Sequence, residues 1–162
     1  MSTLRANAGR ALDQNRPKGR VLALDYGRKR VGIAVSDELR LTAQPLSILK
    51  RVNRAIDVGR VREICRAHGV SRIIVGQPLH MTGEAGEMAE EAARFAARIQ
   101  KELGIQVEMV DERLTSWQAE QTVGHARRRG SEPVDDVAAA VLLREYLDRE
   151  NGAAGALRTE GD

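Results

Sequence analysis

The chain has 162 residues, enough for one domain with a substantial core, and its 42% hydrophobic and 30% charged residues are ordinary for a globular protein. Its net charge of +3 mildly favours a polyanionic partner without establishing one. Aromatic residues make up 2%, which argues against recognition of single strands by base stacking, so any nucleic-acid contact should run through the phosphate backbone. One cysteine excludes an intramolecular disulfide and a cysteine-rich zinc site.

The two ends differ from the centre in composition. Residues 1–19 are polar and rich in arginine, and we interpret them as a disordered basic leader. Residues 151–162 are rich in glycine and alanine, and we expect a disordered tail there. The core, 20–150, should form one domain. Its apolar runs are too short for a signal peptide or a membrane span, so we expect a cytoplasmic protein without a membrane partner.

Taken in chain order, the apolar patterns predict alternating strands and helices. The predicted strands cover 20–26, 30–36, 42–50, 71–75 and 105–110. The predicted helices cover about 53–68, 84–103, a polar stretch from about Ser116, and about 133–150. Asn53 and Gly69 are expected to cap the first helix, and Pro45 to mark an edge strand or a bulge. This order indicates an α/β layered fold with a mixed sheet.

Acidic residues follow two of the apolar strands. Asp25 and Glu112 each stand at the C-terminal end of a strand, and such ends meet at one edge of a parallel sheet. Asp135 and Asp136 lie in the first turn of the last helix on its apolar side, and periodicity does not choose between them. Asp111 should point to the opposite side of the sheet from Glu112. Converging carboxylates suit Mg²⁺ or Mn²⁺, and two such ions can promote phosphodiester hydrolysis.

Basic residues lie near these acids in two runs. Arg28, Lys29 and Arg30 form the turn after Asp25, and Arg127, Arg128 and Arg129 precede Asp135. An acidic site repels phosphate until metal binds, so we expect these runs to form the nucleic-acid-binding rim, the alternative being solvated charge runs. The histidines have no metal-like spacing, and we interpret His80 as a surface residue.

Four segments carry a resemblance to a known family. They are LDYGRKRVGIAVSD (24–37), IIVGQPLHMTGEAGEMAEEAARFAARI (73–99), VDERLTSWQAE (110–120) and VDDVAAAVLLREYLD (134–148). In this order they resemble the YqgF/RuvX family, whose members are described as pre-16S rRNA nucleases or Holliday junction resolvases. The combination of DYGxxRxG and DERLTS is specific, whereas either motif alone is weaker.

The resemblance implies an RNase H-like fold, with a mixed five-stranded sheet flanked by helices, and metal-dependent phosphodiester hydrolysis. It implies Asp25, Glu112 and Asp135 as the catalytic acids and the ligands of Mg²⁺ or Mn²⁺, with Asp135 preferred over Asp136 because of the alanine pair that follows. The implied partner is structured RNA, a pre-16S rRNA within a ribosomal precursor particle, or branched DNA. Arg28 departs from the family pattern, and the connection between Glu120 and Asp135 matches it poorly.

Three alternatives stay open from the sequence. A resolvase of branched DNA would use the same chemistry but would need a dimer with two sites. An ATP-binding domain of the actin or sugar-kinase type has a related fold and a phosphate turn like Asp25-Tyr26-Gly27, yet normally needs two domains. A non-catalytic RNA-binding assembly factor would not need the three acids. The sequence leaves the oligomeric state open.

Overall fold

A computed structural model describes residues 19–77, 86–112 and 136–159, with side chains up to 152 in the last helix. The five strands are β1 (Arg20–Tyr26), β2 (Arg30–Ser36), β3 (Ala43–Lys50), β4 (Val70–Gln77) and β5 (Gln106–Asp111). They form one sheet in the order β3-β2-β1-β4-β5. The β1–β2 and β2–β3 pairs are antiparallel, whereas β1–β4 and β4–β5 are parallel. The predicted mixed five-stranded sheet is confirmed.

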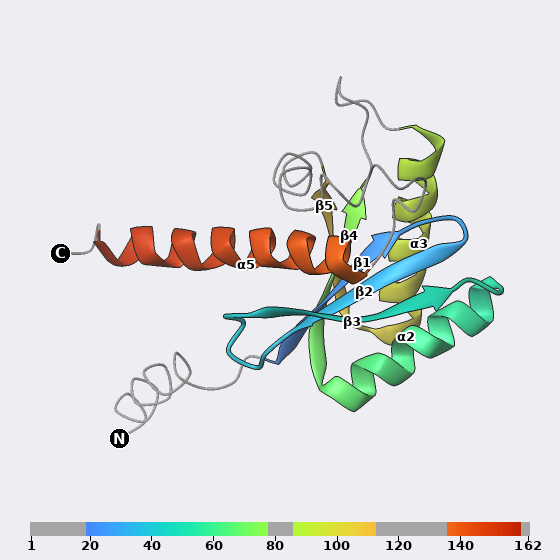
Figure 1. The fold of residues 1–162 in the computed structure, drawn as a ribbon, viewed down its shortest axis with the longest axis horizontal. Coiled ribbons are helices and arrows are strands. Elements are labelled where there is room, and N and C mark those ends of the chain that lie inside the picture. Colours follow the sequence, from blue (N-terminus) through green and yellow to red (C-terminus); the bar gives the residue numbers. More distant parts are fainter. Residues whose placement is uncertain (1–18, 78–85, 113–135, 160–162) are drawn as a thin grey trace.

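In the described part of the chain, three helices cover this sheet: α2 (Arg54–His68), α3 (Glu87–Leu103) and α5 (Asp136–Thr159). Helices α2 and α3 lie on one face and α5 on the other, so the domain has three layers (Figure 1). Alternation along β1 divides its side chains between two cores. Leu22 and Leu24 pack toward α2 and α3, whereas Val21 and Ala23 pack toward α5. The long apolar strands of the sequence therefore reflect a sheet that is buried on both sides.

The hairpin and the edge strand follow their sequence signals. β3 is at one edge of the sheet, and its pairing with β2 shifts register between Ile33 and Ala34. Pro45 stands opposite Ala34 on this edge strand, so its missing N–H removes no bond from the interior of the sheet. The predicted edge position and bulge are confirmed.

Helix α2 has both of the predicted caps. The side chain of Asn53 accepts a hydrogen bond of 2.9 Å from the amide of Ile56. Gly69 ends the helix in the left-handed conformation (φ 63°), and its N–H donates to the carbonyl of Cys65. Helix α3 begins at Glu87 after Gly86, a little later than the predicted start near Glu84, because the glycine supplies the extended N-cap conformation.

The last helix ends later than the sequence predicts. Helix α5 continues to Thr159, although the sequence predicts its end near Glu150 and disorder over 151–162. The side-chain amide of Asn151 donates to the carbonyl of Arg40 (3.2 Å), which ties the start of this extension to the β2–β3 loop. Alanine, which dominates the following residues, has the highest helix propensity. Farther along, the helix extends beyond the sheet (Figure 1).

A part-buried polar contact links α5 to two strands of the sheet. The hydroxyl of Tyr146 donates to Glu108 of β5 (3.0 Å) and accepts from Arg72 of β4 (2.8 Å). With the apolar contacts of Ala139, Leu142 and Leu143, this fixes the position of the helix over the sheet. Among the described helices, none has the length and apolar character needed to cross a bilayer.

Candidate active site

Asp25 lies near the C-terminal end of the central strand β1 and is 6% exposed. It points to the α5 face, because Val21 and Ala23, four and two residues earlier, belong to that core. Both of its neighbours in the sheet are glycines, with Gly32 opposite it on β2 and Gly76 beside it on β4. No side chain of an adjacent strand therefore covers the sheet surface at its level.

Glu112 follows β5 directly, and its amide donates to the carbonyl of Gln77 (3.2 Å). Its side chain lies over Gly76: a Cβ atom placed on that glycine would be 2.4 Å from Oε1 and 2.9 Å from Cγ of Glu112. Neighbouring strands are ~4.8 Å apart, so the carboxylate lies one strand away from Asp25 on the same face. The predicted convergence of these two acids agrees with this placement, and Gly76 is what leaves room for it.

The two carboxylates fit a hard divalent cation. Their donor atoms are oxygens, as Mg²⁺ and Mn²⁺ prefer, and the missing side chain of Gly76 lets the Glu112 carboxylate lie on the face that carries Asp25. Asp111 lies on the opposite face, because Val110 belongs to the α5-side core and successive residues alternate. Among the residues that the structure describes, no three acidic, histidine or cysteine side chains form a metal cluster, so the described part of this site consists of two acids.

The third predicted acid, Asp135, lies outside the described residues, as do Arg127, Arg128, Arg129 and His80. The helix that follows it does reach the correct face. Asp136 opens α5, and the buried positions Ala139, Leu142 and Leu143 share a core with Ala23 and Val110, each two residues before one of the acids. The first turn of α5 thus belongs to the same layer as the two acids.

The basic turn after Asp25 is held toward the other face. Arg28 donates to Glu91 of α3 (3.1 Å) and lies 3.5 Å from Glu87, while Lys29 is exposed and Arg30 half-buried. The hydrogen bond from Arg28 holds the pKa of the Glu91 carboxyl below its ordinary value. No local sequence pattern indicates the Arg28–Glu91 pair, because the two residues are 63 positions apart.

Arg51, which the sequence analysis did not single out, fixes the same turn. Its guanidinium donates to the Tyr26 hydroxyl (2.7 Å) and the Gly27 carbonyl (3.3 Å), and its backbone amide donates to the carbonyl of Lys29 (2.9 Å). The buried carboxylate of Asp57 accepts from Arg51 in turn (3.3 Å). The strand end that carries Asp25 is therefore continued by a restrained turn.

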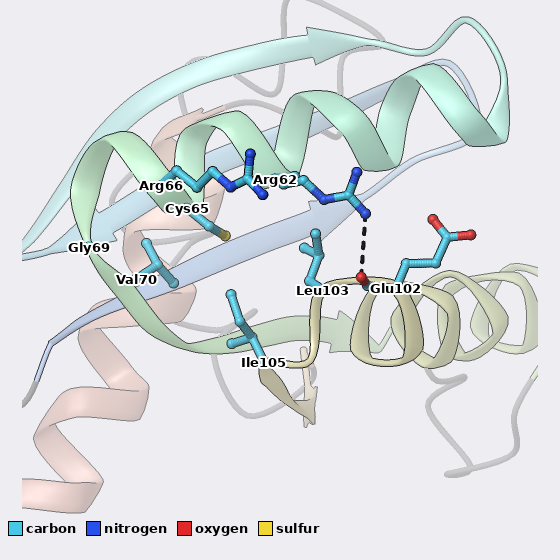
Figure 2. Close-up of a pocket in the computed structure, with 8 residues that line it drawn as sticks. All are labelled: Arg62, Cys65, Arg66, Gly69, Val70, Glu102, Leu103 and Ile105. Atoms are coloured by element: carbon cyan, nitrogen blue, oxygen red, sulfur yellow. Dashed lines mark hydrogen bonds between the residues drawn. The ribbon is translucent and has the colours of Figure 1, made fainter.

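The most voluminous of the hollows described, about 470 Å³, lies elsewhere (Figure 2). It is lined by the ends of α2 and α3 and by the start of β4. Asp25 lies near the opposite end of the parallel strands β1 and β4. Arg62 crosses it to the carbonyl of Glu102 (3.3 Å). Burial raises the pKa of the Cys65 thiol in its lining to about 11, so the thiol is not a nucleophile at neutral pH. This hollow adds nothing to the site.

Comparison with known families decides the classification. The family model described as "RuvX: Holliday junction resolvase" matches residues 19–149. The chain belongs to the RuvX family. A relative from Thermosynechococcus vestitus named "Putative pre-16S rRNA nuclease" is 40% identical and aligns with 88% of this chain and 96% of its own. Another of that name, from Moorella thermoacetica, is 41% identical over 82% of this chain and 99% of its own.

Solved structures support the same fold. Thermus thermophilus RuvC in complex with a Holliday junction substrate aligns with a TM-score of 0.57 at 16% identity, covering 83% of this chain and 96% of that one. A second RuvC structure from the same organism gives a TM-score of 0.50 at 17% identity, over 82% and 96% of the respective chains. At such identities the likeness concerns the fold, which confirms the predicted RNase H-like class for this RuvX family member.

Proposed function

We propose that this protein is a metal-dependent nuclease that hydrolyses phosphodiester bonds, with pre-16S rRNA in a ribosomal precursor particle as its substrate and the cytoplasm as its location. The observation that carries the proposal is the placement of Asp25 and Glu112 on one face, where Gly76 leaves room for the Glu112 side chain. The names of the RuvX relatives support the RNA substrate.

Each proposed residue has a defined task. Asp25 and Glu112 would hold Mg²⁺ or Mn²⁺, with Asp135, which directly precedes α5, as the third ligand. Divalent cations in such a site activate water and stabilise the leaving oxygen of a phosphodiester. The turn Arg28–Arg30 and the run Arg127–Arg129 hold the substrate backbone, since the unmetallated acids repel phosphate. The burial of Asp25 limits the water that competes for it.

Substitution of Asp25 by asparagine tests the proposal. Asp25→Asn keeps the shape of the side chain and removes one ligand charge, so cleavage should be abolished while the fold is kept. Relief of repulsion between acids could even raise the melting temperature. Turnover near the wild-type rate by a folded Asp25→Asn variant, at ordinary metal concentrations, would contradict the metal site.

A branched-DNA resolvase is the second candidate, and the description of the matched family favours it. Cleavage of a 16S precursor and of a four-way DNA junction should be measured in parallel, with Mg²⁺, Mn²⁺ or chelator. Preference for the precursor supports the RNA substrate, and preference for the junction supports the resolvase. Binding without cleavage of either would instead favour an assembly factor.

A further inference from the structure

A second hollow, of about 280 Å³, lies near the C-terminal end of β1, as Asp25 does, but on the face of the sheet that α2 and α3 cover. Tyr26 reaches it because it follows Asp25 in β1 and so points to the opposite face. We name it the arginine pocket, and its lining residues are Tyr26, Arg51, Arg54, Glu91, Arg94, Phe95 and Arg98.

The charges of the arginine pocket do not cancel. Arg51 pairs with Asp57 (3.3 Å) and Arg98 lies 3.1 Å from Glu102. The lining carboxylate, Glu91, is already bonded to Arg28. By contrast, within the described segments no carboxylate lies within 4.0 Å of the guanidinium of Arg54 or Arg94. Arg94 does interact electrostatically with Glu91, but that carboxylate is already bonded to Arg28. The four arginines that line the hollow therefore outnumber its one carboxylate, which favours an anionic ligand.

Arg51 forms a rigid wall of the pocket. Its guanidinium lies 4.9 Å from the ring centroid of Tyr26 and 5.2 Å from that of Phe95. With the ion pair to Asp57, these contacts fix its orientation before any ligand binds. Nε and Nη1 of Arg51 are already engaged by Asp57, Tyr26 and Gly27, so Arg51 mainly shapes the pocket. Contact with a phosphate falls to Arg54 and Arg94, because planar guanidinium donors match the oxygens of a phosphate.

We infer that the arginine pocket binds a backbone phosphate of the nucleic acid whose chain is cut at Asp25 and Glu112. The inference rests on the proposed nuclease function and adds a substrate-binding site on the other side of the sheet edge. A polyanion is favoured over a free anion because the pocket continues into the basic turn: Arg28 bonds to Glu91, which lines it. A nucleic-acid strand can contact the turn and the pocket together, whereas a free phosphate occupies only one of them.

The test uses the full chain carrying Asp25→Asn, so that binding is measured without cleavage. The probe is a fluorescein-labelled RNA hairpin with a single-stranded extension, followed by fluorescence anisotropy over a series of salt concentrations. Arg54→Gln with Arg94→Gln should weaken binding about tenfold at low salt, as expected when charge-assisted hydrogen bonds to phosphate are removed. The log–log salt slope should become shallower by about 0.7–0.9 for each phosphate that the variant no longer neutralises.

The matched control is Arg62→Gln with Arg66→Gln, which removes the same charge from the hollow near the opposite end of β1 and β4. The affinity of this control variant for the RNA should stay within about twofold of that of the Asp25→Asn protein. Unchanged affinity and slope in the Arg54/Arg94 variant, or an equal loss in both double variants, would overturn the inference. A thermal-shift titration with inorganic phosphate tests whether the pocket binds a free anion instead of a backbone phosphate. Stabilisation that depends on Arg54 and Arg94, with unaltered RNA binding, would mean a free-anion site and would also overturn it.

The two proposals fail separately. Suppose that the Arg54/Arg94 variant loses RNA affinity while the wild-type protein cleaves neither RNA nor junction. Binding of RNA by the arginine pocket is then supported, and the nuclease function is contradicted. If the wild-type protein cleaves and the variant binds RNA normally, the nuclease stands and the pocket inference is wrong.

Discussion

Gly76→Ala is the substitution that most directly tests the geometry of the two acids. The added Cβ would lie 2.4 Å from Oε1 of Glu112, whereas ordinary van der Waals contact begins at 3.4 Å. The carboxylate must therefore move by about 1 Å away from its place beside Asp25. A misplacement of about 1 Å in a catalytic group costs about 100-fold in rate, which is about 2.7 kcal/mol of activation free energy.

The same substitution should cost little stability. Glu112 is half-buried, and its flexible side chain can swing from Cγ outward toward solvent, so the clash is relieved at the expense of the site. We expect a loss of about 1 kcal/mol in the free energy of unfolding, the lower end for overpacked positions, and a fall in melting temperature of about 2–4 °C. The assay is single-turnover cleavage at saturating metal, alongside thermal unfolding.

Gly59→Ala is the matched control, because a Cβ at that position in α2 meets nothing within 4 Å. It should leave cleavage unchanged and stabilise the protein by about 0.5–1 kcal/mol, as alanine does in a helix interior. Wild-type cleavage by a folded Gly76→Ala protein would show that Glu112 need not lie over Gly76 for catalysis. Equal losses of activity in both variants would point to a general effect on the fold.

Three further outcomes are expected. Asp135→Asn should reduce cleavage by more than the about 10–100-fold typical of residues that only orient ligands, and Asp136→Asn by less; the reverse order would move the third ligand by one position. Burial raises the pKa of the Cys65 thiol to about 11, so about one thiol in a thousand is ionised at pH 8, and iodoacetamide should label the native protein far more slowly than the unfolded one. Burial alone would raise the pKa of Asp37, but hydrogen bonds from the amides of Thr42 and Leu41 outweigh it and lower that pKa. Wild type should therefore be more stable than Asp37→Asn by about 1 kcal/mol in the free energy of unfolding. This difference should be complete above pH ~4 and disappear as the pH falls further. A difference that stays constant down to pH 2 in urea unfolding would contradict this prediction.

The sequence predicted elements whose signals are local. The hairpin 20–26 and 30–36 has the observed bounds, because two continuous apolar runs and a glycine turn define it within one short segment. Asn53 and Gly69 marked the ends of α2 for the same reason. The end of α5 was missed, because glycines among the alanines at 152–156 suggested a tail, whereas the structure continues the helix through them.

The site was predictable in part. Asp25 and Glu112 could be placed at strand ends from the apolar runs before them. The role of Gly76 could not, since it depends on the parallel pairing of β1 with β4 and on a side chain that follows β5. The arginine pocket likewise joins residues of β1, α2 and α3. Such contacts are set by packing between elements, and they leave no periodic signal in the chain.

The position of β3 at an edge of the described sheet has a consequence for the protein at high concentration. An exposed edge strand offers unpaired N–H and C=O groups to another chain and so invites intermolecular sheet growth. Here Pro45 removes one donor, the shifted register at Ile33/Ala34 distorts the edge, and the exposed Lys50 ends it with a charge. All three features hinder the addition of a flat strand from another molecule. The irregularity of β3 thus protects the folded protein against aggregation through its sheet.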